Sequence, residues 1–128
     1  MILLDTCALL YLGNDVSALS QTAADAIRSP GTMVAVSSIS AFEVGQKAAR
    51  GQLRLPLPVD QWFVRMLRQH RLRELPISGV IAARATLLPF IHRDPFDRIL
   101  VATAMEHQLT LLTPDQTIRQ YPGLKTLW

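Results

Sequence analysis

The sequence has only one cysteine, Cys7, among its 128 residues, which excludes an internal disulfide and suits a reducing compartment. It also lacks a long hydrophobic run, since no stretch approaches the roughly 20 apolar residues that cross a bilayer. The apolar opening is interrupted at Asp5, too early for a signal peptide. We therefore expect a cytosolic protein that does not enter a membrane.

Histidine is scarce as well, and the three histidines, His70, His92 and His107, are too dispersed for their spacing to indicate a metal-binding set. No second cysteine is present to complete such a set. Cys7 stands at the start of an expected apolar helix, where we predict that it packs in the core. A metal site in this chain is therefore expected to consist of carboxylates.

Length and composition indicate one globular domain spanning residues 1–128, because single cores usually hold about 100 to 150 residues. Hydrophobic residues make up 49% of the chain and charged residues 18%, a balance that excludes the disordered class. The net charge is +3, which is compatible with a polyanionic partner but does not require one.

The basic residues concentrate between Glu43 and Glu74, where a phosphate backbone could contact them. Three of them recur every three residues along one expected helix, which is either a nucleic-acid stripe or a solvent-exposed face, and we favour the second. The basic residues of this segment are Lys47, Arg50, Arg54, Arg65, Arg68, Arg71 and Arg73.

Short apolar runs bounded by turn residues predict the strands of a sheet. The first two are expected at residues 2–4 and 33–36, the clearest at 109–113, and a last one at 125–128. Residues 75–77 form a weaker candidate at a sheet edge, where proline is tolerated.

Helical spacing of apolar residues predicts the segments between the strands. We expect one helix to begin at about residue 7, with Thr6 as its cap. Further helices are expected at 17–28, 58–69, 78–88 and 95–107. A further helix is capped by Ser37 or Ser38 and ends before Gly51, with an apolar face of Ile39, Phe42 and Ala49. Strands that alternate with helices predict a mainly parallel sheet covered on both faces, an α/β/α sandwich.

Four acids lie where the segments of such a sheet would converge. Asp5 directly follows the first strand, and Asp115 follows the strand that ends at Thr113. Glu43 lies about two turns into the helix after the second strand, and Asp97 lies in the first turn of the helix before the fourth. The working crevice of a parallel sheet lies beyond the carboxyl ends of its strands, so these acids can meet there.

Carboxylates a few ångströms apart repel one another unless a cation lies among them. Oxygen ligands without a His or Cys set suit Mg²⁺ or Mn²⁺ rather than Zn²⁺. A bound ion can generate hydroxide from water for attack at phosphorus. The four acids therefore favour nuclease chemistry.

Each acid also has an ordinary structural explanation. Asp5 could end a strand and cap the next helix, and Glu43 could pair with Lys47 on a helix surface. Asp94 before a proline is typical of an N-cap, and Asp97 would then stabilise the helix dipole from the first turn. Their combination at compatible edges of one sheet favours the functional interpretation.

Accessory roles are weaker predictions. Arg93, Arg98 and Lys47 could hold a substrate phosphate, although a solvated surface role explains each equally well. Thr6 and Thr113 could hydrogen-bond to water molecules on a metal ion, although helix capping also explains both.

Several motifs, in order, resemble those of the PIN-domain VapC toxins of bacterial type II toxin–antitoxin systems. The resemblance covers essentially the whole chain and includes its Leu-Trp ending. The motifs are LLDTCALL at 3–10, SSISAFEV at 37–44, HRDPFDRIL at 92–100 and LTPD at 112–115.

This resemblance implies a PIN fold and a Mg²⁺-dependent ribonuclease that acts through metal-activated water. Asp5, Glu43, Asp97 and Asp115 take the family's acidic positions, with Asp5 and Asp97 as the expected direct ligands and Asp94 as an accessory. The family also implies an RNA substrate, a cognate VapB antitoxin and a homodimer. Products with a 5′-phosphate and a 3′-hydroxyl are expected.

Two alternatives remain open at this point. A receiver-type signalling domain also binds Mg²⁺ in a small α/β fold, but it needs paired acids after the first strand, which Asp5-Thr6-Cys7 lacks. The other alternative is a PIN fold that binds RNA or protein without cutting RNA. The presence of all four acids argues against such a loss of activity. One departure from the family is Gly45, where we expect either close packing on a neighbour or a less rigid helix.

Overall fold

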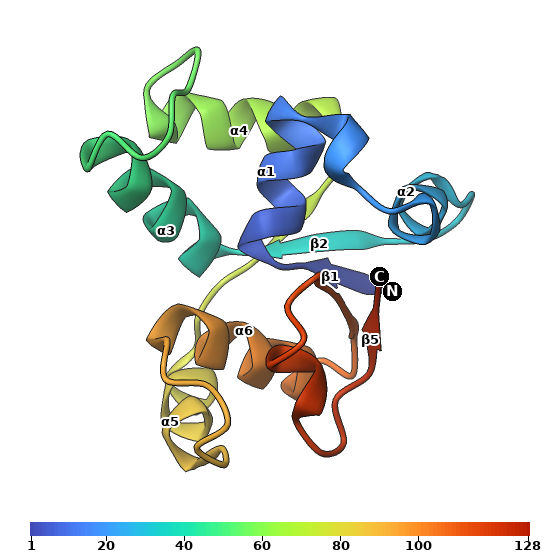
Figure 1. Cartoon of the computed structure of the whole chain (residues 1–128), viewed down its shortest axis with the longest axis vertical. Coiled ribbons are helices and arrows are strands. Elements are labelled where there is room, and N and C mark those ends of the chain that lie inside the picture. Colours follow the sequence, from blue (N-terminus) through green and yellow to red (C-terminus); the bar gives the residue numbers. More distant parts are fainter.

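The computed structural model describes residues 1–128 as one parallel sheet of five strands between two layers of helices (Figure 1). All four strand pairings are parallel, and the strand order is β3-β2-β1-β4-β5. The predicted α/β class is confirmed. The strands are β1 Ile2–Leu4, β2 Val34–Ser37, β3 Arg73–Leu75, β4 Thr110–Leu112 and β5 Thr126–Leu127.

The helices alternate with the strands along most of the chain, as the pattern predicts. Two short 3-10 turns, Val16–Ala18 and Ile118–Gln120, supplement them. None of the helices combines the length and the apolar character needed to cross a membrane. The helices are α1 Thr6–Asn14, α2 Gln21–Arg28, α3 Ser38–Ala49, α4 Val59–Gln69, α5 Gly79–Leu87 and α6 Pro95–Glu106.

The sheet separates two apolar cores. Leu4 of β1 packs in the core that includes Trp62 and Phe63 of α4, whereas its neighbour Leu3 packs in the core that includes Val101 of α6. Successive side chains of a strand point to opposite faces, so a strand covered on both faces must be apolar throughout. This requirement explains the uninterrupted apolar runs, and α1, α3 and α4 lie opposite α5 and α6 across the sheet in Figure 1.

The chain changes direction across the sheet at β1. After β1 the chain adds β2 and β3 on one side, and later β4 and β5 on the other. Leu4 is in register with Leu112, and the Asp5 amide donates to the Leu112 carbonyl at 3.0 Å. The carboxyl ends of β1 and β4 therefore lie side by side at a topological switch point, where parallel sheets place their binding crevices.

Two local predictions are wrong. The buried face of α3 consists of Ser40, Glu43 and Val44, whereas Phe42, expected in the core, is 61% exposed. Two of these buried residues, Ser40 and Glu43, are polar, and Ser40 hydrogen-bonds to Thr6 of α1. The edge strand β3 lies at Arg73–Leu75 and ends before Pro76, since proline has no N–H to donate to a neighbouring strand.

Two glycines allow helices to approach α4 closely. A Cβ atom at Gly45 would lie 3.3 Å from Cγ1 of Val59, so α3 packs closely on the start of α4. Gly13 lies inside α1, and a Cβ there would lie 3.0 Å from both Trp62 Cζ2 and Met66 Sδ. Close packing against α4 therefore explains why glycine, a poor helix former, occupies both positions.

Candidate metal-dependent nuclease site

Asp5 both caps a helix and is a candidate site residue. It follows β1 and is the N-cap of α1, where its Oδ1 accepts a hydrogen bond from the Ala8 amide at 2.7 Å. The expectation that Thr6 caps this helix is wrong, because Thr6 is its first residue. The Thr6 hydroxyl instead hydrogen-bonds to the Ser40 hydroxyl at 3.0 Å, which joins α1 to α3. The Asp5 side chain is nevertheless buried, with 2% exposure of the residue.

Glu43 is not the exposed half of a surface ion pair. Its residue exposure is 9%, and its Oε1 is buried with no hydrogen-bond partner. Lys47 Nζ lies 3.9 Å from the other carboxylate oxygen, Oε2, so a single long contact compensates the charge. A buried carboxylate oxygen without a donor is costly unless a ligand satisfies it.

Asp94 and Asp97 occupy the start of α6. Asp94 is the N-cap, and its Oδ1 accepts a hydrogen bond from the Phe96 amide at 2.9 Å, as the sequence predicts. Asp97, in the first turn, extends toward the crevice, where its Oδ2 lies 3.1 Å from Nε2 of His92. Asp94 therefore stabilises the first turn of α6, which contains Asp97.

Asp115 lies in the turn that follows β4. Its amide donates to the Thr113 hydroxyl at 3.1 Å, and its Oδ1 accepts from the amides of Thr117 at 2.7 Å and Ile118 at 3.2 Å. Its Oδ2 hydrogen-bonds to Nε2 of His92 at 3.2 Å. Both carboxylate oxygens of Asp115 are thus held in place.

The charges of neighbouring acids affect the pKa values of Asp5 and Asp97. Burial, together with the charges of Asp94, Glu43, Asp5 and Asp115, raises the pKa of Asp97 to about 8. Burial likewise raises the pKa of Asp5 to about 6, with contributions from Glu43 and Asp115. A cation placed among these carboxylates would lower the electrostatic cost of ionising them.

The pKa of Asp115 is lowered, although burial by itself would raise it. Hydrogen bonds from Ile118, His92 and Thr117 lower this pKa below its usual value. For Asp5, a hydrogen bond from the Thr113 side chain and the Ala8 amide partly offset the effect of burial. The site therefore combines one stably charged carboxylate with two that ionise reluctantly without a counter-ion.

The residues present fit a divalent cation. The unpartnered Oε1 of Glu43 and the raised pKa values of Asp5 and Asp97 both indicate negative charge that the protein alone does not compensate. One ligand atom each from His92, Asp97 and Asp115 lies within 4.8 Å of the others. Hard divalent ions prefer such carboxylate oxygens.

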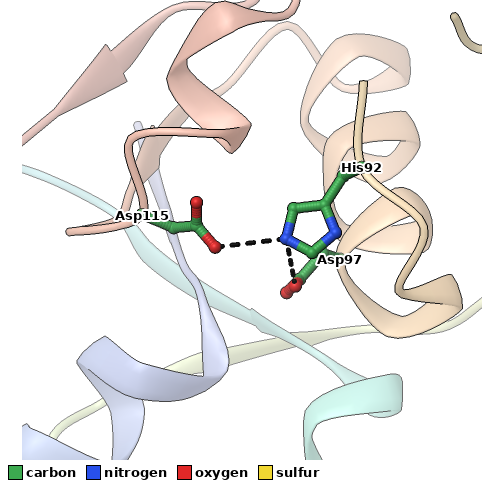
Figure 2. Close-up of side chains that lie close together, drawn as sticks. All are labelled: His92, Asp97 and Asp115. Atoms are coloured by element: carbon green, nitrogen blue, oxygen red, sulfur yellow. Dashed lines mark hydrogen bonds and ion pairs between the residues drawn. The ribbon is translucent and has the colours of Figure 1, made fainter. Parts of the chain in front are cut away.

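His92 is the site residue that sequence reasoning missed. The spacing of the three histidines matches no zinc motif, yet His92 lies between Asp97 and Asp115 (Figure 2). The available signal was its position, two residues before the N-cap Asp94, which requires it to lie beside the start of α6.

Arg98 does not face the crevice. Its guanidinium is buried and donates four hydrogen bonds to carbonyl oxygens, at distances from 2.8 to 3.2 Å. We therefore withdraw the expectation that Arg98 binds a phosphate. The four carbonyls belong to Ala85, Leu88, Pro89 and His92.

Two other residues near the site are accessible. Arg93 is exposed, and the side chain of Lys47 is 39% exposed, so phosphate contact stays a prediction for both. The expectation that Cys7 packs in the core is wrong, because Cys7 is exposed on the first turn of α1. The apolar face of that helix begins instead at Ala8 and Leu9.

Comparison with known proteins agrees with this fold. Residues 2–124 match the model of the PIN domain family, and the chain belongs to that family. It is 34% identical over 130 residues to Ribonuclease VapC22 of Mycobacterium tuberculosis, a match that covers 99% of this chain and 98% of the relative.

Solved structures with the same fold come from toxin–antitoxin complexes. VapBC2 from Rickettsia felis, bound to a DNA fragment from its promoter, has a TM-score of 0.75 at 17% identity, covering 99% of this chain and 98% of that one. A toxin–antitoxin complex from Klebsiella pneumoniae has a TM-score of 0.66 at 24% identity, covering 100% and 97%. At these identities the likeness establishes the fold.

Proposed function

We propose that this protein is a divalent-metal-dependent ribonuclease and the toxin of a type II toxin–antitoxin pair. The observation that carries the proposal is a group of acids in which the pKa values of Asp5 and Asp97 are raised while the buried Oε1 of Glu43 has no partner. Membership of the PIN family and similarity to a protein named as a ribonuclease support RNA as the substrate. The four acids are Asp5, Glu43, Asp97 and Asp115.

Within this proposal Asp5 and Asp97 bind the ion directly, and Glu43 and Asp115 complete the negative site. Mg²⁺ or Mn²⁺, when bound, supplies Lewis acidity and makes water a stronger nucleophile toward phosphorus. Asp115 stays charged because backbone amides hold its Oδ1, so it fixes one wall of the site. Thr113 supports this wall through the Asp115 amide.

Substrate phosphates approach the acids from the exposed side of the crevice. Lys47 and Arg93 are accessible cations close in sequence to Glu43 and Asp97, and we assign them to phosphate binding. Charge at these positions offsets the repulsion between RNA and a group of carboxylates. Thr6 and Asp94 act indirectly, by joining α1 to α3 and by capping α6.

Cleavage of RNA by the purified protein tests the proposal. We expect activity with Mg²⁺ or Mn²⁺, none with a chelator, and products that end in a 5′-phosphate and a 3′-hydroxyl. Asp97→Asn, purified in parallel and shown to be folded by circular dichroism, is expected to lose at least a hundredfold in rate. Products with a 2′,3′-cyclic phosphate, or activity that survives chelation, would contradict the proposed chemistry.

A VapB-type antitoxin is the proposed protein partner, and the cytoplasm, where RNA is available, is the proposed location. The toxin–antitoxin complexes that share this fold support the pairing. Expression of the chain alone is expected to arrest growth, and co-expression of the protein encoded beside it is expected to relieve the arrest. Asp97→Asn serves as the control, because a folded but inactive chain leaves growth unchanged.

A further inference from the structure

His92 is held in one orientation by three separate contacts. Its amide donates to the Tyr121 hydroxyl at 3.0 Å, and its carbonyl accepts from Arg98 Nη1 at 3.2 Å. Its ring Nδ1 accepts a hydrogen bond from the Asp94 amide at 3.1 Å. Backbone and ring are therefore both fixed relative to the start of α6.

The contact at Nδ1 determines which ring nitrogen carries the hydrogen. A backbone amide can only donate, so Nδ1 must be the bare, accepting nitrogen. In the neutral imidazole the hydrogen is then on Nε2. Nε2 hydrogen-bonds to Oδ2 of Asp115 at 3.2 Å and lies 3.1 Å from Oδ2 of Asp97, as Figure 2 shows.

We propose that His92 is a positioning residue, whose Nε2–H draws the carboxylates of Asp97 and Asp115 together at the spacing that a divalent ion needs. The inference rests on the proposed nuclease function. The two acids come from α6 and from the turn after β4, and a donor between them counters the repulsion of their charges. Carboxylates that bind metal ions are commonly held by such hydrogen bonds.

The alternative is that His92 is itself a metal ligand, since a ring nitrogen of His92 lies within 4.8 Å of a carboxylate oxygen of Asp97 and of Asp115. A ligand nitrogen must be free of hydrogen, so the hydrogen would then lie on Nδ1. There it would face the Asp94 amide, and two donors would meet where the structure has a hydrogen bond. The geometry therefore favours positioning over ligation.

The imidazole nitrogens can be observed directly by ¹⁵N NMR of the full chain, at a pH where all three histidines are neutral. We expect His92 to carry hydrogen on Nε2 and none on Nδ1, both without metal and after saturation with diamagnetic Mg²⁺. His92→Gln assigns the signals. Hydrogen on Nδ1, or loss of the Nε2 hydrogen when Mg²⁺ is added, would overturn the proposal.

Substitutions test the same assignment by function. A glutamine amide can occupy the place of Nε2 and donate, whereas the shorter asparagine reaches only the place of Nδ1. We expect His92→Gln to keep Mn²⁺ affinity and cleavage within about tenfold, and His92→Asn and His92→Ala to lose 10- to 100-fold in both. His107→Gln, at an exposed position beyond α6, is the matched control.

Thermal unfolding of each variant shows whether the fold is intact before these values are compared. Undiminished Mn²⁺ affinity in folded His92→Ala would refute the positioning role. If the wild-type chain does not cleave RNA, the proposed function fails by itself. The NMR result and the Mn²⁺ titration still decide the role of His92 in that case.

Discussion

Helix caps and candidate site residues coincide at Asp5 and lie within one helical turn of each other at Asp94 and Asp97. Asp5 caps α1 while its buried carboxylate belongs to the acidic site, and Asp94 caps the helix that carries Asp97. The structural and functional explanations of these acids are therefore compatible. Capping orients each helix start so that its first turn faces the crevice.

Substitutions at Asp5 separate the two roles. Asn caps helices as well as Asp does, so Asp5→Asn is expected to abolish cleavage while keeping the hydrogen bond to the Ala8 amide. Asp5→Ala is expected to abolish cleavage and also to be less stable than Asp5→Asn by about 1 kcal/mol. Chemical denaturation and RNA cleavage of both variants provide the test, and full activity in Asp5→Asn would remove this residue from the site.

Three of the candidate acids could be predicted from sequence because each lies at a recognisable boundary. Asp5 comes directly after an apolar strand, Asp115 lies in the turn after another, and Asp97 follows an N-cap and a proline. His92 and Arg98 could not be assigned, because their roles depend on contacts made by the loop between α5 and α6. Sequence spacing does not reveal that Arg98 points into that loop or that His92 reaches Asp115, 23 residues away.

At the scale of elements, Arg98 closes the loop that carries His92. Its guanidinium joins the end of α5, the following loop and α6 through four carbonyl contacts, with the Phe90 ring 5.0 Å from Cζ. A planar group with several fixed donors can satisfy these acceptors together, whereas a lysine ammonium cannot. Arg98 is therefore expected to support the site through the loop.

Arg98→Lys is expected to lower the free energy of unfolding by about 3 kcal/mol, because buried carbonyls lose their donors. Arg65→Gln, at an exposed position on α4, is the control and should change stability by less than about 0.5 kcal/mol. Urea denaturation measures both. Equal stability of the two variants would show that the contacts of Arg98 contribute little.

Gly13 in α1 gives a second prediction at this scale. Alanine is the better helix former by about 1 kcal/mol, but its Cβ would lie 3.0 Å from the rigid Trp62 ring. We expect Gly13→Ala to lose about 1 kcal/mol of stability. Gly79→Ala, at the start of α5 where a Cβ meets nothing within 4 Å, should instead be neutral or stabilising. A stabilising Gly13→Ala would mean that α1 and α4 are free to separate.

The elements were predicted more accurately than the faces they bury. Alternating apolar runs sufficed for the order of strands and helices, with ends shifted by a few residues. The wrong face of α3 arose because periodicity assigns apolar residues to the core. Around Glu43 the site requires polar residues on the inner face, which leaves Phe42 outside, with its ring centroid 5.7 Å from that of Phe96.

For the whole molecule, the acidic site makes the metal-free protein sensitive to pH. Asp97 and Asp5 have folded pKa values of about 8 and about 6, above the usual value of 3.8. A raised folded pKa contributes stability below the unfolded value, and that contribution is lost as pH rises through the folded value. We therefore expect these two groups to destabilise the metal-free protein progressively between about pH 4 and pH 8.

Asp97→Asn removes the larger of the two contributions to the loss of stability with rising pH. Without metal, the variant is expected to gain stability over the wild type as pH rises, by about 1 kcal/mol or more at pH 8. Thermal unfolding of both proteins in chelator across this range measures the difference. A difference that is constant with pH would show that Asp97 does not bear the raised pKa. The lowered pKa of Asp115 acts below pH 4 and does not affect this window.

The expected homodimer remains a prediction, which light scattering of the purified chain can test. The proposed ribonuclease activity depends more directly on carboxylates of separate segments holding one cation. Calorimetric titration of Mn²⁺ and Mg²⁺ into the metal-free protein is the most direct test of that claim. We expect saturable binding by the wild type that weakens at least tenfold in Asp97→Asn. Absence of binding of either ion, or equal binding by Asp97→Asn, would contradict it.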